Sequence, residues 1–440
     1  KYKGIYNKLW LILCSLFIYA SFGYKGVAYL LLILAFNYCI GRLIIKNKRI
    51  SNILFLSGLI FNISIWLLIK NYLFIENSYN FIFNTYYKFQ HWYVPVGWGM
   101  IILQQIYYLI ECKRKIILSY NVIDYLTFSL FFPKLIAGPL VSYNNFIANF
   151  SKKTFYFNYK NISAALFIFF YGLFLKVFFA DTFFVIVEKG FLSNSLNFVQ
   201  AWVISLCNIF SIFFDISGYT NMAKGIALLF NIKIPDNFNY PFKSLNVKDF
   251  WDRWHTTFTL FFKNNIAQPI LNKINNFYGN VIAFLSLFIV MSLWHKFTFT
   301  FVLWGLINAI GVIISYAFTK IKINLPKFIA WTITFIFLNF SWVFFSADTL
   351  SQAIVVIKGM LSIKSIFIYY NEFFILWPIG ANFIIVLLLI LSLFMVLKLK
   401  NTESLIANFI TSYKYLIIII LFIITTLLFN TEKPFLYYAF

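Results

Sequence analysis

Long apolar runs recur from end to end of this chain, and they limit its possible folds more than any other feature of the sequence. Each run approaches the ~20 residues that an α-helix needs to cross the hydrocarbon core of a bilayer. The runs are nearly continuous and do not alternate with polar residues, so they predict helices and not the strands of a membrane barrel. The sequence therefore predicts an all-α polytopic membrane protein with about ten or eleven transmembrane helices. The runs cover residues 9–24, 27–45, 52–70, 94–111, 161–187, 199–230, 280–295, 298–318, 328–346, 372–397 and 415–430.

Two further segments differ from simple spans. The apolar run 122–141 contains Pro133 and Pro139, and proline removes a helical hydrogen bond and clashes with the preceding turn. We expect this run to be re-entrant or bent. The connection 231–280 holds the aromatic and amphipathic stretch 250–262, which predicts interfacial helices that lie at the cytoplasmic face or dip into it.

The charge of the chain indicates how it is oriented. It has 36 Lys and Arg against 13 Asp and Glu, a formal net charge of +23. Most of these cations fall in short connections between apolar runs, as expected if they set the topology and meet anionic membrane lipid. We therefore expect no nucleic-acid partner. Placing the dense clusters in the cytoplasm predicts a multi-pass protein of the cytoplasmic (inner) membrane, with a cytoplasmic amino terminus and an extracytoplasmic carboxy terminus.

The chain shows no sign of a soluble domain, so we interpret residues 1–440 as a single integral-membrane domain that ends in an extracytoplasmic aromatic tail at 431–440. The cysteines lie in or beside apolar runs without the spacing of a metal motif, and we expect no metal. They are typical of small core residues. The four are Cys14, Cys39, Cys112 and Cys207.

The chain holds three histidines, and His295 is the one placed between two predicted spans. An ionisable side chain in a bilayer interior is costly and is therefore a functional candidate. A neutral imidazole can act as general base towards a hydroxyl or a thiol, because imidazole titrates near neutral pH. The alternative is a histidine that packs between helices and bonds to a carbonyl. His255 has the weaker case, because interfacial Trp, Arg and His are common in a segment of its kind.

Several charged and aromatic residues are further candidates for a binding site. Arg253 can meet a phosphate or carboxylate of an anionic donor, or it can extend to a lipid headgroup. Asp215 is a charge inside an apolar run, as are Lys176 and Asp181, and such charges form structural ion pairs or part of a site. The remaining candidates for donor binding are Trp251, Trp254 and Trp294.

The carboxy-terminal stretch 433–440 is aromatic and includes Tyr437. Such a tail can be an aromatic anchor at the membrane interface. It can also be an acyl relay, because a phenol that loses its proton is a nucleophile and its acyl ester is activated towards a second transfer. The residues alone leave both interpretations open.

An ordered set of motifs resembles the membrane-bound O-acyltransferase family, in the bacterial branch that acylates alginate, peptidoglycan or teichoic acid. The matches run through most of the chain in the order found in that family. Any single motif is weak, but the ordered set is specific. The motifs lie at residues 94–97, 132–139, 172–181, 215–223, 235–241, 250–255, 293–295 and 301–305.

The resemblance implies a ring of helices, thinned at its centre, where funnels from the two faces nearly meet at a central histidine. It implies that His295 is the catalytic histidine and His255 its supporting partner. The tail resembles the F-x-Y-x-x-F ending of the acetylating members, with Phe435, Tyr437 and Phe440 in register, which makes Tyr437 the candidate acyl carrier.

The chain also differs from the family pattern beside the catalytic histidine. Ser292 and Lys296 stand where glycines are usual, and residues 265–270 replace the run that usually follows the second histidine. Lys296 either acts on the imidazole as a neighbouring cation or extends to the outer interface.

The activity implied by the resemblance is transfer of an acetyl group from a cytosolic thioester, acetyl-CoA, to a glycan acceptor of the cell envelope. Peptidoglycan is the first predicted substrate, and an alginate-like exopolysaccharide is the second. An extracytoplasmic partner with its own serine nucleophile, resembling a serine esterase, would complete the transfer. Two alternatives stay open, which are transfer of D-alanine to teichoic acid by the same core and a transporter without covalent chemistry.

Overall fold

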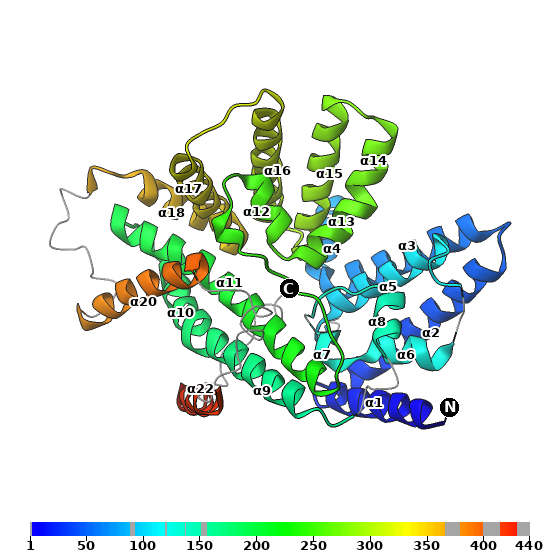
Figure 1. Cartoon of the computed structure of the whole chain (residues 1–440). Helices are drawn as coiled ribbons and strands as arrows, with labels where there is room; N and C mark the ends of the chain where they lie inside the picture. Colours follow the sequence, from blue (N-terminus) through cyan, green and yellow to red (C-terminus); the bar gives the residue numbers. More distant parts are fainter. Residues whose placement is uncertain are drawn as a thin grey trace. The chain divides into compact units, whose positions relative to one another are not determined.

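The computed structural model describes residues 2–88, 93–118, 121–136, 138–150, 156–365, 379–398 and 414–428. Every regular element in these ranges is a helix (Figure 1). The chain divides into two compact units. The first unit contains Lys1–Phe169 and Met222–Pro235, and the second contains Phe170–Asn221 and the described part of Asp236–Leu436.

The first unit is held together by the packing of α2, α3 and α5. Asn37 of α2 and Asn62 of α3 exchange two buried amide hydrogen bonds of 2.7 and 3.1 Å, which satisfies polar groups that would otherwise be costly in an apolar interior. The helices of this unit are α1 (Tyr2–Ala20), α2 (Tyr24–Lys46), α3 (Ser51–Lys70), α4 (Tyr72–Phe83), α5 (Trp98–Lys113), α6 (Val122–Leu130), α7 (Phe132–Leu135), α8 (Tyr143–Asn149) and most of α9 (Tyr159–Phe174).

The second unit contains the longer helical hairpins and the histidine-bearing segments. Its helices are η1 (Leu175–Ala180), α10 (Asp181–Phe191), most of α11 (Phe198–Leu229), η2 (Pro241–Lys243), α12 (Val247–Arg253), α13 (Thr256–Phe262), η3 (Lys263–Ala267), α14 (Gln268–Lys273), α15 (Phe277–His295), α16 (Phe299–Lys320), α17 (Lys327–Ser346), α18 (Leu350–Leu361), α20 (Ile379–Lys398) and α22 (Lys414–Leu428).

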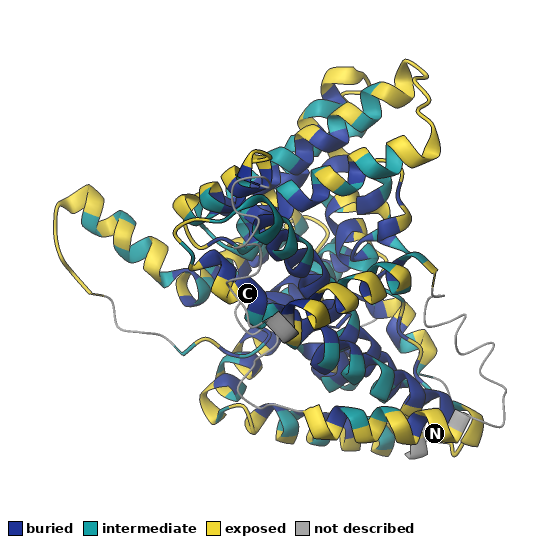
Figure 2. Ribbon diagram, turned by 90° about the vertical axis from the view of Figure 1, so that its left-hand side faces the viewer, coloured by how far each residue is buried: buried dark blue, intermediate teal, exposed yellow. Residues whose placement is uncertain are grey.

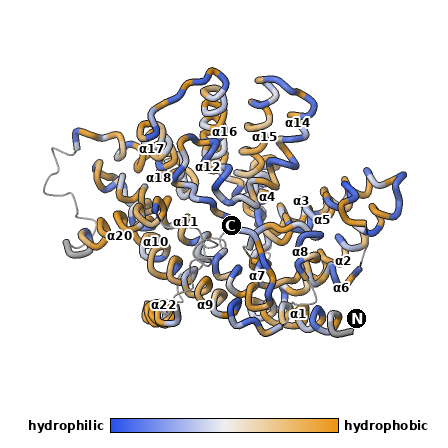
Figure 3. Tube along the Cα trace, viewed as in Figure 1, coloured by the Kyte–Doolittle hydropathy of each residue, from blue (hydrophilic) through white to orange (hydrophobic). Residues whose placement is uncertain are grey.

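Many of these helices have outward-facing apolar surfaces, which water does not tolerate over a large area but lipid does. In α3, only 22% of the most apolar stretch is buried. Long helices are hydrophobic along most of their length (Figure 3), although they carry many exposed residues (Figure 2). The described residues include seven helical stretches long and apolar enough to cross a membrane, at Tyr24–Lys46, Ser51–Lys70, Tyr159–Phe191, Phe198–Leu229, Phe277–His295, Phe299–Lys320 and Lys327–Ser346.

The predicted helical, polytopic membrane protein is thus confirmed, while the predicted number of crossings stays a prediction. One run takes a different form from the one expected. The sequence predicts a span over 94–111, but α5 has 16 residues, or about 24 Å of helix. It is not among the seven stretches, and it is buried along nearly its whole length.

The run 122–141 is bent, as predicted. α6 ends at Leu130, Phe131 has a non-helical backbone (φ −55°, ψ 99°), and the single turn α7 begins at Phe132 with Pro133 next. The ammonium of Lys134 is buried in the first unit, 3.8 Å from the centroid of the Phe128 ring. The proline-containing turn therefore directs a cation into the protein, where an aromatic face stabilises it.

The aromatic segment that the sequence predicted at an interface dips into the second unit. Its helices α12, α13 and α14 follow one another with short breaks. Phe250, Trp254 and Phe258 are nearly fully buried. Burying these large aromatic side chains away from water stabilises the fold. The segment therefore packs inward, and His255, which lies within it, is buried as well.

Candidate active site

His295 is the last residue of α15, and the close packing of α15 against α16 sets its position. Gly305 of α16 is the point of closest approach, because a Cβ atom there would lie 2.7 Å from Ser292 Oγ and 2.8 Å from the Phe288 carbonyl oxygen. Ser292 fits at this contact by donating its hydroxyl to the Ile289 carbonyl at 2.8 Å. The hairpin is therefore tight beside the histidine.

The His295 imidazole lies among aromatic rings from three helices. Its ring centroid is 5.5 Å from that of Phe258, 6.0 Å from Trp304 and 5.5 Å from Phe345. These rings come from α13, α16 and α17. The side chain is partly exposed, so a base at this position has apolar walls and is not fully buried.

Lys296, the residue after the candidate base, forms an ion pair at the surface. Its Nζ atom lies 3.1 Å from Asp348 Oδ1, and the two side chains are 45% and 75% exposed. Pairs this exposed contribute about 0–1 kcal/mol. The Lys296 ammonium therefore has a carboxylate partner at the protein surface, and its effect on the neighbouring imidazole stays a prediction.

His255 lies in the break between α12 and α13 and is 3% exposed. Its backbone is left-handed (φ 43°, ψ 54°), a conformation that is strained for residues other than glycine. Hydrogen bonds on both sides hold it, from Thr256 N–H to the Asn237 carbonyl at 2.7 Å and from Thr259 N–H to the His255 carbonyl at 2.9 Å. Burial lowers the pKa of His255 to about 4, so its imidazole is neutral at physiological pH.

Phe258 connects the two histidines. Its ring centroid is 5.0 Å from that of His255 and 5.5 Å from that of His295. The separation of the two imidazoles cannot exceed the sum of these distances. The structure therefore brings together two histidines 40 positions apart in the sequence, with one phenyl ring in contact with both.

Sequence reasoning missed Phe258, although a signal for it exists. It follows His255 by only three positions, on the first turn of the helix that His255 precedes. The contacts of Phe345 and Trp304 with His295 carry no such local signal, because these residues come from other helices.

The predicted donor-binding tryptophans lie in the wall of the site. The Trp251 indole donates to Asn308 Oδ1 at 3.1 Å, and its ring lies 5.6 Å from Trp304. Trp254 packs 4.8 Å from Trp342, and Trp294 is buried. Trp251 and Trp254 thus join the α12 segment to α16 and α17, whereas Trp294 belongs to α15.

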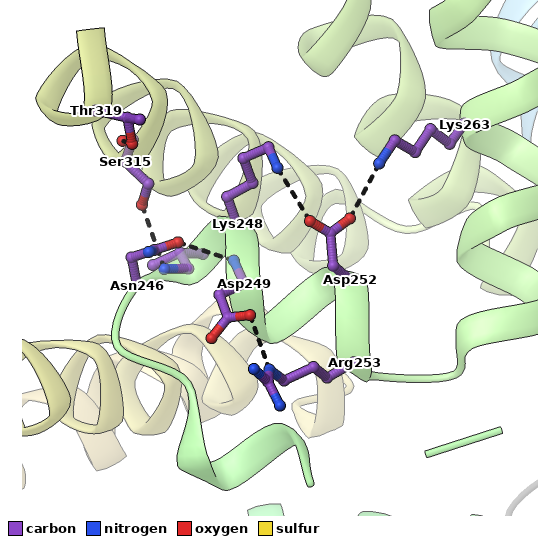
Figure 4. A network of polar contacts seen from close by, with 9 residues as sticks. Asn246, Lys248, Asp249, Asp252, Arg253, Lys263, Ser315 and Thr319 are labelled. Carbon is purple, nitrogen blue, oxygen red and sulfur yellow. Dashed lines mark hydrogen bonds and ion pairs between the residues drawn. The ribbon is translucent and has the colours of Figure 1, made fainter. Parts of the chain in front are cut away.

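Arg253 lies apart from the histidines in a half-exposed polar network (Figure 4). Its Nε atom donates to Asp249 Oδ1 at 2.7 Å. Next to this pair, Lys248 and Lys263 both bind Asp252, at 3.0 and 3.1 Å. Arg253 is therefore positioned by a carboxylate while its guanidinium stays partly accessible.

Asp215 belongs to a separate buried cluster. Lys176 Nζ lies 2.6 Å from Asp215 Oδ1 and 2.7 Å from Asp181 Oδ1. The π-helical turn η1 carries the lysine, α11 carries Asp215, and Asp181 begins α10. The three charges that the sequence located inside apolar runs thus form one ion-pair triad.

A small cavity of about 80 Å³ with a mostly apolar lining lies near His255. Phe238 is one of its walls, and the Phe238 ring centroid is 6.2 Å from that of His255. Thr220, Asn237 and Tyr240 contribute polar groups to the lining. The cavity is large enough for a few waters or a small acyl group, and no local sequence pattern predicts it.

Tyr437, the candidate acyl carrier, is in the tail and lies outside the described residues. The third histidine, His91, for which the apolar segment beside it predicts an interfacial position, also lies outside them. As for a metal centre, no group of three or more His, Cys, Asp or Glu that could hold an ion occurs within the ranges described above.

Comparison with known proteins identifies the family. The profile of MBOAT, the membrane-bound O-acyltransferase family, matches residues 30–351. The chain is 37% identical over 401 residues to the peptidoglycan O-acetyltransferase of Helicobacter pylori, which covers 82% of this chain and 75% of that protein. It is 26% identical over 373 residues to the probable alginate O-acetylase AlgI of Pseudomonas aeruginosa, at 81% and 70% coverage.

A more distant likeness extends to the teichoic acid D-alanyltransferase of Bacillus subtilis, at 29% identity over 198 residues, 42% of this chain and 49% of that protein. The profile match covers both His255 and His295. Taken with the helical fold and its apolar stretches, these findings show that the chain belongs to the membrane-bound O-acyltransferase family and is a multi-pass membrane enzyme that transfers acyl groups.

Proposed function

We propose that this enzyme moves an acetyl group from a cytosolic thioester, acetyl-CoA, across the cytoplasmic membrane for O-acetylation of a cell-envelope glycan, with peptidoglycan as the substrate. The observation that carries this proposal is the 37% identity to a peptidoglycan O-acetyltransferase over most of both chains. Identity to the alginate relatives is 25–29%, so the alginate-like substrate is the second candidate.

The pair of histidines supports a general-base mechanism. His295 is partly exposed and has aromatic walls, so its imidazole is a candidate base. His255 is buried, neutral and fixed by its backbone, and it supports the site through Phe258, which both imidazoles contact. A neutral imidazole held in one orientation offers a fixed N–H donor and a fixed nitrogen acceptor to its neighbours without adding a charge.

We propose that Tyr437 receives the acetyl group. The phenol gives its proton to His295, its oxygen attacks the thioester carbonyl, and the C–S bond breaks. The proton passes from His295 to the departing thiolate, so the first step yields a tyrosine acetyl ester and a free thiol. The serine hydroxyl of an extracytoplasmic partner then attacks this ester, and the Tyr437 phenolate leaves and regains a proton as the serine loses one. A glycan hydroxyl attacks the resulting serine acetyl ester, which gives the O-acetylated glycan and the free serine.

The charge distribution supports the direction of transfer. With the lysine-rich connections in the cytoplasm, the segment bearing His255 and Arg253 begins on the donor side, and the Tyr437 tail lies outside. Arg253 and its neighbouring lysines form a partly exposed cationic surface (Figure 4), which suits a donor with phosphate groups.

The test is mass spectrometry of the purified protein after exposure to acetyl-CoA, with acetylated Tyr437 as the expected product. In cells, His295→Ala and Tyr437→Phe are expected to abolish incorporation of labelled acetate into peptidoglycan at normal membrane levels of the protein. Acetylation that persists in Tyr437→Phe alone would refute the relay but not the enzyme. Enzyme-dependent incorporation of labelled alanine into teichoic acid would instead show D-alanyl transfer. Enzyme-dependent incorporation of labelled acetate into an exopolysaccharide would instead show acetylation of that polymer.

A further inference from the structure

A groove of about 660 Å³ lies at the end of the α16–α17 hairpin that is remote from His295. Its walls are the last turns of α16, the first turns of α17 and the short segment before α12. His295 contacts Trp304 near the start of α16 and Phe345 near the end of α17. The groove and the histidine therefore occupy opposite ends of the same two helices.

Three contacts shape the groove. At its inner end α16 and α17 meet closely, because a Cβ atom on Gly311 would lie 2.5 Å from Phe337 Cζ. On one side, Val247 N–H donates to Ser315 Oγ at 3.2 Å. The Trp331 indole donates to the Phe242 carbonyl at 2.8 Å, which fixes α17 to the same segment. The groove is thus a braced feature of the fold.

The lining is largely apolar and accessible. Ile314 and Phe318 of α16 and Ile333 of α17 are 50%, 40% and 54% exposed. All three belong to helices with the length and composition of membrane spans. From Gly311 to Thr319 the groove runs about 12 Å along α16. Hydrocarbon is the occupant that such a surface favours in a bilayer.

The mouth of the groove is cationic. Lys322 lies in its lining, and Lys320 and Lys327 flank the same connection, which contains no acidic residue. The Lys320 ammonium lies 5.8 Å from the centroid of the Tyr316 ring. No ion pair to these three lysines occurs among the residues that the structure describes. Positive charge at this mouth is therefore available to a ligand.

The nearest acidic groups on α12 do not neutralise this charge. Asp249 is bound by Arg253, and Asp252 is bound by both Lys248 and Lys263 (Figure 4). This network adjoins Asn246, which lines the groove and caps α12 by accepting the Asp249 N–H at 2.8 Å. Counting these five side chains and the three lysines, the region keeps an excess of cations.

We propose that this groove is a binding site for an anionic phospholipid, with one acyl chain along Ile314, Phe318 and Ile333 and the phosphate group held by Lys322, with Lys320 and Lys327 adding positive charge on either side of it in the sequence. Basic pockets between membrane helices are suited to such headgroups. A free phosphate or nucleotide would meet only the lysines and leave the apolar groove unfilled, so the combination of groove and mouth fits a lipid. The site does not depend on which acyl group or glycan the enzyme uses.

The experiment is native mass spectrometry of the full-length protein in detergent, titrated with dioleoylphosphatidylglycerol or dioleoylphosphatidylcholine. We expect one bound anionic lipid at a concentration at least ten times lower than that needed for the neutral lipid. The triple variant Lys320→Gln, Lys322→Gln, Lys327→Gln is expected to lose this tenfold preference. Equal binding of the two lipids to the wild-type protein would overturn the proposal.

Two control variants make the test specific to this groove. Lys46→Gln, Lys48→Gln, Arg49→Gln removes the same amount of charge from the first unit and is expected to keep the preference. Ala330→Trp fills the groove and is expected to weaken lipid binding, whereas Ile310→Trp places the same side chain on an exposed part of α16 outside the groove lining and is expected to bind normally. Loss of the preference in the first-unit variant, or equal binding by the two Trp variants, would place the lipid elsewhere.

Discussion

Replacing Phe258 by alanine is the most direct test of how the two histidines are positioned. The ring is 2% exposed and contacts both imidazoles. Removing a buried phenyl ring costs about 3–5 kcal/mol of stability. It also removes the contact that keeps His255 and His295 in a fixed relation, and a misplacement of about 1 Å at a reacting group slows a reaction roughly 100-fold. That loss corresponds to about 2.7 kcal/mol of activation free energy.

Phe262 provides the matched control, because it is as deeply buried and lies on the same helix. Its ring contacts Phe258 and Phe261, at 4.8 and 5.2 Å. Phe262→Ala is therefore expected to destabilise the protein by a similar amount and to leave the transfer rate within a few-fold of wild type.

The assay has two parts on the same purified samples. Thermal unfolding in detergent measures the loss of stability in each variant. The rate of acetyl transfer from acetyl-CoA, measured at a temperature where both variants are folded, measures the catalytic effect. Equal rates for Phe258→Ala and Phe262→Ala would refute the reasoning, since the histidines would then keep their positions without the shared ring.

Three further predictions concern charges. Lys176→Met is expected to destabilise the protein by about 3–5 kcal/mol in chemical unfolding, because it leaves two carboxylates without their cation; adding Asp215→Asn should recover part of the loss, and a purely additive double variant would contradict the triad. The pKa of His255 is about 4 in the folded state and 6.5 in the unfolded state. Between these two pH values only the unfolded state binds the proton, so the free energy of unfolding is highest above pH 6.5 and falls by about 3 kcal/mol as the pH drops from 6.5 to 4. His255→Gln should flatten this part of the stability–pH curve, and an unchanged slope would contradict the assignment. Asp348→Asn breaks the exposed pair with Lys296 and is expected to change stability by less than about 1 kcal/mol and to leave the transfer rate unaltered; a large drop in rate would instead connect Lys296 to the base.

The groove and the active site share two helices, which gives the lipid proposal a structural context. α16 carries Trp304 and α17 carries Phe345, and both contact His295. About 16 Å along α16 separates Trp304 from Ser315 in the groove. A lipid bound there would lie against the same hairpin that walls the catalytic histidine.

The sequence could identify His295 and His255 because each carries a local signal. One is an ionisable residue between two apolar runs, and the other ends a distinctive aromatic motif. The break at Phe131 was equally predictable, because proline acts on its own helix. Signals of this kind depend only on a few residues that are neighbours in the sequence, so they can be recognised without the tertiary structure.

The contacts that make a site were not predictable in the same way. Lys176 could pair with one aspartate or with two, and only the packing of η1, α10 and α11 brings both carboxylates to it. Lys296 stood beside the histidine in sequence, yet its ammonium binds Asp348. Trp251 and Arg253 belong to one motif, but the first is buried against α16 and the second is half-exposed.

By itself, the sequence determined that this chain is a helical membrane protein and which histidines are the candidates for chemistry. Hydrophobic burial in lipid depends on composition over about 20 residues, so it can be read from any one segment. The tertiary structure decided that Phe258 contacts both histidines, that the aromatic segment packs inward, and that a cationic groove opens between α16 and α17. These features depend on distances between side chains far apart in the sequence, which no local pattern encodes.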